Sequence, residues 1–249
     1  MKAHKSGSVS KTATEATIRP LKEKLIIANK ILESEKIATP FGHVSVRIPG
    51  TETFLITRSI SPGAATMEDI LICDMEGKIL DGKYKDTYSE VVIHTGVYKV
   101  AKAFNSVVHF HSTYVIGLSM AGATVIPANL QATAVGLEPI AVFNKMIYID
   151  KPELGEEVAN LLGPNKAVIL KGHGAVTVGE SIEDAIYSAL NLERSAMFQW
   201  MAWTIAPLAP VSAEEKKALS EYHNGLKRGG HGSSREWTYY KWKLKEQKK

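Results

Sequence analysis

Residues 107–114 read V-V-H-F-H-S-T-Y, a pattern that predicts a buried strand carrying two histidines. The apolar residues favour a strand over about 106–111. Side chains two positions apart lie on the same face of a strand, so His109 and His111 converge while Phe110 faces the opposite side. Two imidazoles placed in this way form part of a typical metal site. The pattern alone also fits two buried histidines that have ordinary hydrogen-bond partners.

A third histidine lies in K-G-H-G at 171–174, between the predicted strands A-V-I-L-K and A-V-T-V. Glycines on both sides of His173 permit backbone conformations that other residues avoid, and they allow another group to approach closely. A tight turn that happens to contain a histidine is the alternative. Three histidines at rigid strand ends, with a fourth position open, match the arrangement of a catalytic zinc site.

A carboxylate that could serve such a site is Glu90, in T-Y-S-E at 87–90, where a helix over 88–103 is predicted to begin. Thr-x-x-Glu is also a capping box, in which Glu90 would bond back to Thr87. The residues by themselves favour this structural role. His94 lies one turn further along the same face and is interpreted as a core histidine, with support of the site as the alternative.

The chain is predicted to form one main domain. Apolar residues at helical spacing indicate further helices over about 19–36, 112–121, 153–162, 181–205 and 212–223. The segments H-V-S-V-R-I, T-F-L-I-T-R and I-L-I-C-D alternate and are separated by turn residues, which is typical of antiparallel strands. We therefore predict an α/β fold of the α+β type, a three-layer α/β/α sandwich around a mainly antiparallel sheet. The expected segments are a flexible N-terminal stretch 1–18, the main domain 19–225 and a C-terminal tail 226–249.

Composition excludes several classes of protein. With 249 residues, 45% hydrophobic and 22% charged, the chain is long enough and apolar enough to bury a core. No apolar run approaches the roughly 18 residues of a membrane helix, and the N-terminus lacks the apolar stretch of a secretion signal. Cys73 is the only cysteine, which excludes an internal disulfide, so we expect a cytoplasmic protein.

The net charge of +4 is concentrated at the ends of the chain. The tail from Leu226 onward contains eight Lys or Arg residues and two Glu, and its aromatic residues alternate with polar ones. This pattern favours a tail that packs on the body or on a neighbouring subunit over a nucleic-acid-binding face.

Four segments together resemble the class II aldolase/adducin family, which includes fuculose-phosphate aldolases and ribulose-phosphate epimerases. They are G-H-V-S-V-R at 42–47, S-E-V-V-I-H-T-G-V-Y at 89–98, V-V-H-F-H-S at 107–112 and L-K-G-H-G-A-V-T-V-G at 170–179. They follow the order and the approximate spacing of the family, and the resemblance spans most of residues 20–205.

The resemblance implies a central antiparallel sheet between helical layers, with 19–225 as the catalytic domain. It implies one divalent metal per subunit, zinc by preference and manganese, cobalt or iron as alternatives, held by His109, His111 and His173. The acid–base role falls on Glu90, with a pKa raised by partly apolar surroundings. It further implies a homotetramer whose active sites lie at subunit interfaces and are completed by an aromatic residue of the neighbour. The candidates for that residue are Tyr222, Tyr239 and Tyr240.

Two departures from the sugar-phosphate members bear on the substrate. Gly42-His43 replaces a Gly-Asn pair, and T-R-S-I-S-P-G at 57–63 replaces a small polar phosphate loop. The planar guanidinium of Arg58 suits a carboxylate, although a surface arginine that ends a strand is the alternative. We expect Arg58, His43, Ser59 and Ser89 to contact substrate, and the serines still suit a phosphate.

Three readings of the function follow. The first is a metal-dependent carbon–carbon lyase, a decarboxylase of a hydroxylated, dihydroxy-aromatic or oxo carboxylic acid. The second is a sugar-phosphate aldolase or 4-epimerase, and the third is a non-catalytic adducin-like module. The expected partner is a small molecule, with no nucleic acid and no membrane.

Overall fold

The computed structural model describes residues 14–38, 40–225 and 231–247, and its centre is one eight-stranded sheet. The strands run in the order β4-β3-β2-β1-β5-β8-β7-β6, and every pair is antiparallel except β6 with β7. Their bounds are β1 Gly42–Arg47, β2 Thr53–Thr57, β3 Ile70–Asp74, β4 Ile79–Asp81, β5 Ser106–Phe110, β6 Ala141–Phe143, β7 Ala167–Leu170 and β8 Gly174–Gly179. The mainly antiparallel sheet is confirmed.

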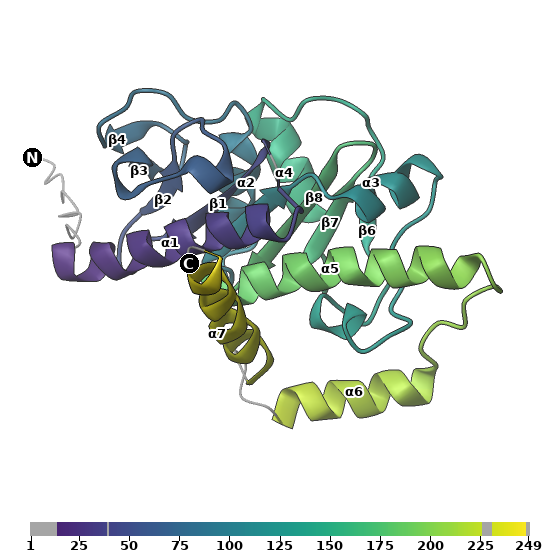
Figure 1. Cartoon of the computed structure of the whole chain (residues 1–249). Coiled ribbons are helices and arrows are strands. Elements are labelled where there is room, and N and C mark those ends of the chain that lie inside the picture. The colour runs from purple at the N-terminus through teal and green to yellow at the C-terminus, as the bar shows by residue number, and fades with distance from the viewer. Residues whose placement is uncertain (1–13, 39, 226–230, 248–249) are drawn as a thin grey trace, which may run out of the picture.

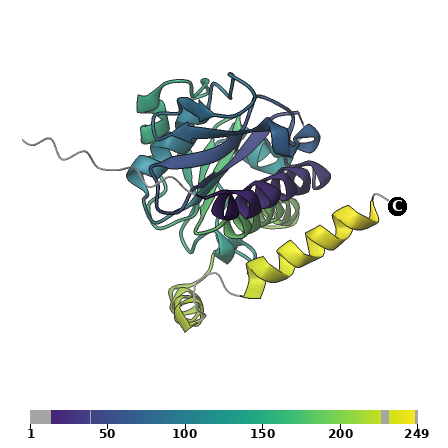
Figure 2. The same cartoon turned by 90° about the vertical axis from the view of Figure 1, so that its left-hand side faces the viewer.

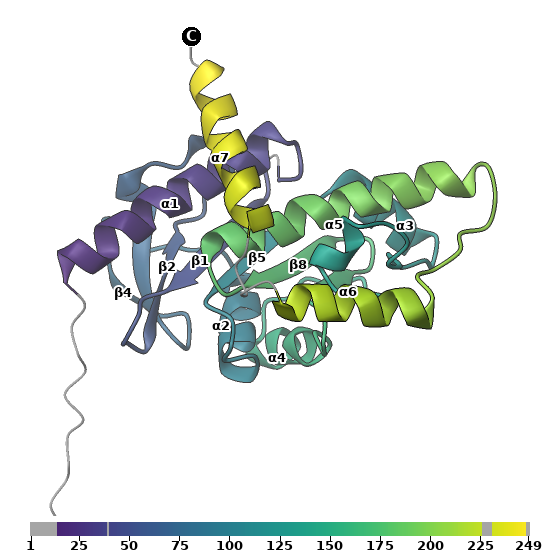
Figure 3. The ribbon, with the colours of Figure 1, turned by 90° about the horizontal axis from the view of Figure 1, so that it is seen from below.

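Helices cover both faces of this sheet. Their bounds are α1 Glu15–Ser34, α2 Val91–Val100, α3 Thr113–Met120, α4 Pro152–Asn160, α5 Ile182–Trp203, α6 Ala213–Gly225 and α7 His231–Glu246, with short 3-10 turns at Pro62–Ala64, Met67–Asp69 and Ala132–Ala134. Figure 3 shows α1, α5 and α7 on one side of the sheet, and α2 and α4 on the other. The three-layer sandwich is therefore confirmed (Figure 1).

The alternation of side chains along the strands creates two separate cores. In β5, Val108 and Phe110 pack toward α1 and α5, whereas Val107 packs toward α2 and α4. His109 shares the α2 side with Val107, because successive strand residues point to opposite faces. The strand that carries the histidines is thus fixed by apolar contacts on both of its faces.

One sequence prediction about the N-terminal segment and one about the edges of the sheet need correction. The flexible segment was predicted to extend to residue 18, but α1 already begins at Glu15; residues 1–13 lie outside the described part. The short strands β4 and β6 were not predicted, because three residues carry too little periodicity to be recognised.

The C-terminal residues form a helix on the body. Within α7, Trp237 and Tyr240 join the core formed with α1 and α5. Two ion pairs fix the helix, Arg194–Glu236 at 2.8 Å and Lys243–Glu35 at 2.7 Å. The described part of the tail thus packs on the body, while its predicted place at a subunit interface stays a prediction; residues 226–230 and 248–249 lie outside the description. In contrast, Figure 2 shows α6, in yellow-green, standing apart from the layered body.

Among the described helices, none is both long enough and apolar enough to cross a membrane.

Two glycines set the distance between α2 and α4. A Cβ added to Gly96 would lie 2.3 Å from the backbone carbon of Gly155, and one added to Gly155 would lie 2.0 Å from Val92 O. The two helix backbones therefore touch directly. This contact holds α2 directly against α4 and so helps to position the residues that α2 carries.

We expect Gly96→Ala to lower the free energy of unfolding by about 1–3 kcal/mol, because an overpacked contact forces the backbones apart. Gly117→Ala is the matched control: Gly117 is exposed in α3, and its added Cβ would meet nothing within 4 Å. This control should be neutral or stabilise by up to about 1 kcal/mol. Urea denaturation measures both, and equal effects of the two substitutions would contradict the contact.

Candidate metal centre

Three separate segments bring a cluster of polar side chains to one end of the sheet. His109 lies near the end of β5, and His111 follows the strand directly. Because β8 pairs with β5, the turn from β7 to β8 places His173 beside them. Gly174 is required there, since a Cβ would lie 2.1 Å from Phe110 O, and Gly172 has a φ of +63°.

The donor atoms of His109, His111, His173 and Glu90 all lie within 4.8 Å of one another. The Nε2 atoms of His109 and His111 are 2.9 Å apart. Glu90 Oε2 lies 3.4 Å from His109 Nε2, and Glu90 Oε1 lies 3.3 Å from His173 Nε2. The structure thus brings together the three predicted ligands and the predicted acid–base residue.

Hydrogen bonding fixes which nitrogen of His109 faces the cluster as an acceptor. His109 Nδ1 lies 3.1 Å from Ala175 O, and a carbonyl oxygen can only accept, so Nδ1 carries the hydrogen. In the neutral ring Nε2 then presents a lone pair toward His111. A backbone carbonyl that orients a histidine in this way is typical of metal ligands.

The cluster fits a divalent cation. Glu90 Oε1 is buried and has no hydrogen-bond partner, although three imidazoles surround the carboxylate. Converging lone pairs and an unpartnered buried carboxylate oxygen are costly unless a shared cation satisfies them. Three imidazoles and one carboxylate are donors that zinc accepts at tetrahedral positions.

The acidity of Glu90 differs from the sequence prediction. Burial by itself raises the pKa of this carboxyl, but the hydrogen bond to His109 and the charges of His109, His173 and His111 lower it to about 2. The predicted raised pKa is therefore wrong for the protein without metal. Apolar surroundings were expected to dominate, whereas the neighbouring imidazoles favour the charged carboxylate.

The capping role considered for Glu90 is also wrong. The helix α2 begins at Val91, with Glu90 at the N-cap and no capping bond from its side chain. Thr87 Oγ1 instead donates to Thr57 O at 3.3 Å. The carboxylate is consequently turned toward the histidines.

His43 lies beside the cluster and starts a buried polar network. Its ring centroid is 5.0 Å from that of His109 and 4.2 Å from that of Tyr88. His43 Nδ1 is 2.6 Å from His94 Nε2, so the two histidines are hydrogen-bonded. Burial lowers the pKa of both, that of His94 to about 3, with neighbouring histidines adding to the effect. His94 therefore supports the site rather than only filling the core.

The other residues predicted to contact substrate, Arg58, Ser59 and Ser89, lie outside the cluster. Arg58 Nε donates to Asp69 Oδ1 at 2.7 Å, and its guanidinium stacks on Tyr84 with 4.3 Å between the guanidinium carbon and the ring centroid. Ser59 and Ser89 are exposed. Among the described contacts, none joins Arg58 to the cluster directly.

Tyr88 links the Arg58 loop to the site. Its hydroxyl donates to Ile60 O at 2.8 Å and lies 2.8 Å from Thr57 Oγ1, while its ring packs on His43. No role was predicted for Tyr88. Its position two residues before Glu90 was the signal available.

The candidate aromatic residues of the C-terminal region are placed in two ways. Tyr240 is buried in its own chain and accepts a hydrogen bond from Arg194. Tyr222 and Tyr239 are exposed, at 64% and 50%. Tyr240 is therefore held within its own chain, whereas the side chains of Tyr222 and Tyr239 reach the surface.

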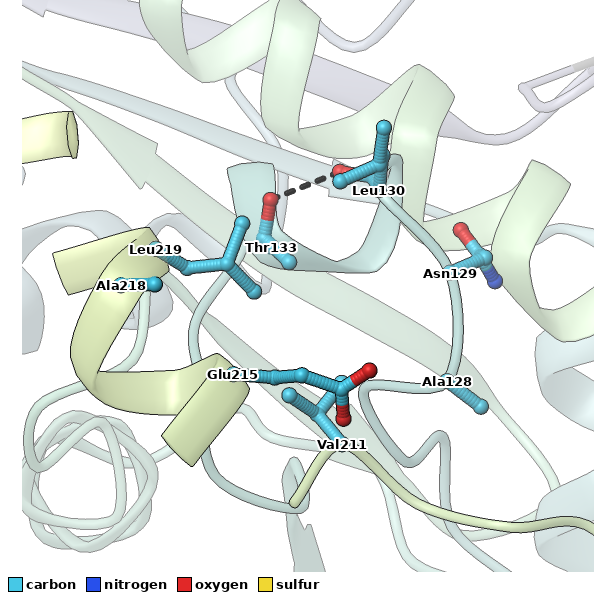
Figure 4. A pocket seen from close by; sticks show the side chains of 8 residues that line it. All are labelled: Ala128, Asn129, Leu130, Thr133, Val211, Glu215, Ala218 and Leu219. Atoms are coloured by element: carbon cyan, nitrogen blue, oxygen red, sulfur yellow. Dashed lines mark hydrogen bonds between the residues drawn. The ribbon is translucent and has the colours of Figure 1, made fainter. Parts of the chain in front are cut away.

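A pocket of about 420 Å³ lies away from these residues, between α6 and the segment 128–133. Figure 4 shows Leu219 of α6, Thr133 of the other segment and Val211, which precedes α6, around this hollow. Its lining is mainly apolar and includes none of the four cluster residues. It contributes nothing to the chemistry of the site.

This geometry and the family comparison agree. Residues 7–200 match the model for the class II aldolase and adducin N-terminal domain, so the chain belongs to this family.

Relatives within the family differ in activity. The chain is 30% identical to an L-fuculose phosphate aldolase of Methanococcus maripaludis over 186 residues, which is 73% of this chain and 96% of the relative. It is 26% identical to a 3,4-dihydroxyphthalate decarboxylase of Arthrobacter keyseri, covering 70% of this chain and 75% of the relative. Gamma-adducin of Rattus norvegicus is 23% identical, covering 87% of this chain and 32% of the relative.

The fold itself is shared with a solved structure of this type. The solved structure of an aldolase II superfamily protein from Pseudomonas syringae superposes with a TM-score of 0.80 and 23% identity, covering 94% of this chain and 95% of that one.

We expect stability to fall as the pH drops from about 7.5 to 5.5. His94 titrates near 6.5 when unfolded but near 3 when folded, so the unfolded state binds more protons in this window. Proton uptake therefore favours unfolding, and His94 accounts for about 1 kcal/mol of the loss by pH 5.5. Urea denaturation of the metal-free protein measures this change. His94→Gln should show a shallower pH dependence, and an unchanged slope would contradict the assignment.

Proposed function

We propose that the chain is a metal-dependent carbon–carbon lyase, a decarboxylase of a hydroxylated or oxo carboxylic acid, dihydroxy-aromatic acids included. The observation that carries this proposal is the convergence of three imidazoles on a carboxylate, one oxygen of which is buried without a hydrogen-bond partner. The chain also resembles a relative that is named as a decarboxylase of 3,4-dihydroxyphthalate.

We propose that His109, His111 and His173 hold one divalent metal, with zinc preferred over manganese, cobalt or iron. When bound, the metal supplies a Lewis acid that stabilises negative charge on substrate oxygens. The neutral ligands support this role because they leave most of the positive charge uncancelled. Burial, with the charge of His109 second, lowers the pKa of His111 to about 3 and also that of His173, so both rings are neutral at pH 7.

In this proposal Glu90 moves the proton at the reacting carbon. Its carboxylate is ionised and lies at the edge of the cluster, next to the position where a substrate would stand. After carbon dioxide leaves, the remaining carbanion-like intermediate takes up one proton. Glu90 delivers that proton after receiving it from solvent or substrate. His43 contacts a substrate oxygen, and Arg58, with Ser59 and Ser89, contacts the far end of the substrate.

A sugar-phosphate aldolase or 4-epimerase is the second candidate. It is favoured by the relative named as an L-fuculose phosphate aldolase, which the match covers almost completely. The exposed hydroxyls of Ser59 and Ser89 suit a phosphate. A non-catalytic module like gamma-adducin is the third candidate, and the assembled cluster argues against it because a scaffold gains nothing from an unpartnered buried carboxylate.

We propose a cytoplasmic homotetramer with active sites at subunit interfaces. Large apolar side chains are exposed close to the cluster. Phe41 is 65% exposed with its ring 5.8 Å from that of His111, and Met120 and Met146, 70% and 75% exposed, lie next to Gly172. Exposed apolar groups at the rim of a site are typical of a surface that a second subunit covers.

Glu90→Gln should lower turnover of the true substrate by about 100-fold or more, because the amide cannot transfer the proton. The assay screens hydroxylated and oxo carboxylic acids for carbon dioxide release and sugar phosphates for aldehyde release. Glu156→Gln is the matched control, since Glu156 pairs with Lys99 on the surface of α4. Full activity of Glu90→Gln would contradict the assigned role.

Arg58→Ala should raise KM for a carboxylate substrate by about tenfold or more, because a charge-assisted contact is lost. Arg58→Lys keeps the charge without the planar fork and should recover only part of the binding. Asp69→Asn weakens the internal ion pair while it retains Arg58, so it reports the structural share of the effect. An unchanged KM in Arg58→Ala would favour the sugar-phosphate reading.

A further inference from the structure

Four buried polar groups form a continuous hydrogen-bonded chain that ends beside the metal cluster. Tyr98 OH lies 2.6 Å from Ser45 Oγ, which lies 2.6 Å from His94 Nδ1. His94 Nε2 then lies 2.6 Å from Nδ1 of His43. All four side chains are at most 2% exposed, so water contributes little to the chain. We name this set, Tyr98–Ser45–His94–His43, the relay.

The direction of the relay follows from counting hydrogens. Within the described part of the chain, Ser45 Oγ is the only partner of the Tyr98 hydroxyl. A buried O–H that finds no acceptor is costly, so Tyr98 donates to Ser45. Ser45 has one hydrogen of its own, and it is left to be donated to His94 Nδ1.

The remaining hydrogens are then determined. His94 accepts at Nδ1, so as a neutral ring it carries its hydrogen on Nε2 and donates it to His43 Nδ1. His43 accepts at Nδ1, so its own hydrogen is on Nε2. Reversing the direction would leave the Tyr98 hydrogen without an acceptor, and having Ser45 accept from both sides would strand the serine hydrogen.

The two histidines remain neutral because of their surroundings. Both are buried, and the groups hydrogen-bonded to them, Ser45 and the partner ring, supply no charge that would favour an imidazolium. A neutral pair has one hydrogen per ring, as the counting requires. A protonated His94 would donate from both nitrogens. Ser45 would then accept from His94 as well as from Tyr98, and its own hydrogen would have no acceptor.

We propose that the relay locks His43 in the Nε2–H form, which makes this nitrogen a hydrogen-bond donor to a substrate oxygen at the cluster. His43 is then neither a fourth metal ligand nor a proton acceptor, because its only lone pair is used by His94. Tyr98, Ser45 and His94 act as positioning residues. The substrate part of this inference rests on the proposed lyase function, while the position of the hydrogen does not.

A fixed donor at this place suits the proposed chemistry. The ring centroids of His43 and His109 are 5.0 Å apart. A substrate oxygen held at the cluster would therefore lie close to the ring of His43. A preorganised N–H stabilises negative charge that develops on such an oxygen. A freely exchanging ring would present a lone pair for part of the time and repel the same oxygen.

The test is nitrogen NMR of ¹⁵N-histidine-labelled full-length protein, which distinguishes protonated from unprotonated ring nitrogens. Wild type should show His43 with hydrogen on Nε2 only. Ser45→Ala removes the hydroxyl that donates to His94 Nδ1 and frees the two rings to reverse, so His43 should show both tautomers. Ser188→Ala, which removes another buried serine hydroxyl, this one from α5, is the matched control and should leave His43 unchanged.

Two results would overturn the inference. One is wild-type His43 with hydrogen on Nδ1, and the other is Ser45→Ala with an unaltered His43 signal. Loading the protein with ¹¹³Cd adds an independent check, because a spin coupling between cadmium and Nε2 of His43 would make it a ligand. These measurements use no substrate, so a missing lyase activity would refute the proposed function without deciding the tautomer.

Discussion

Antiparallel pairing of β5 with β1 on one side and β8 on the other is the constraint on which the site depends. It sets His43 opposite His109, and it brings the turn that carries His173 to the end of β5. Because strand side chains alternate, a slip of one residue would turn His109 into the core beneath α1. The apolar residues on both faces of β5 prevent that slip, so core packing and donor geometry are enforced by the same contacts.

The helix α2 adds the second half of the arrangement. Its N-terminus places Glu90 among the imidazoles, and its buried face carries His94 and Tyr98 against β1. The glycine contact packs this helix directly against α4. The site is therefore a cluster of three imidazoles and one carboxylate. Neutral, fully buried side chains stand behind it, and such surroundings disfavour positive charge on an imidazole.

The sequence predicted the parts of this arrangement that depend on local spacing. His109 and His111 two residues apart, and His173 between glycines, indicated the ligands because strand periodicity and turn geometry are local properties. The resemblance added Glu90. Long-range contacts could not be predicted in the same way: Arg58 meets Asp69 eleven residues later, and the imidazoles reverse the pKa shift expected for Glu90. The relay had a signal, His43 and Ser45 two apart in a strand and His94 and Tyr98 four apart in a helix, but only the packing of α2 on β1 shows that the two pairs meet.

The most direct measurement of the central claim is the metal content of the purified protein, determined by elemental analysis after reconstitution with zinc and removal of excess metal. If the three histidines hold the metal, we expect about one divalent ion per chain in wild type and in His94→Gln, and almost none in His109→Ala. Retention in His94→Gln shows that a lost histidine matters only where it is a ligand. A wild-type protein that binds no metal, or a His109→Ala variant that binds as much as wild type, would contradict the metal centre.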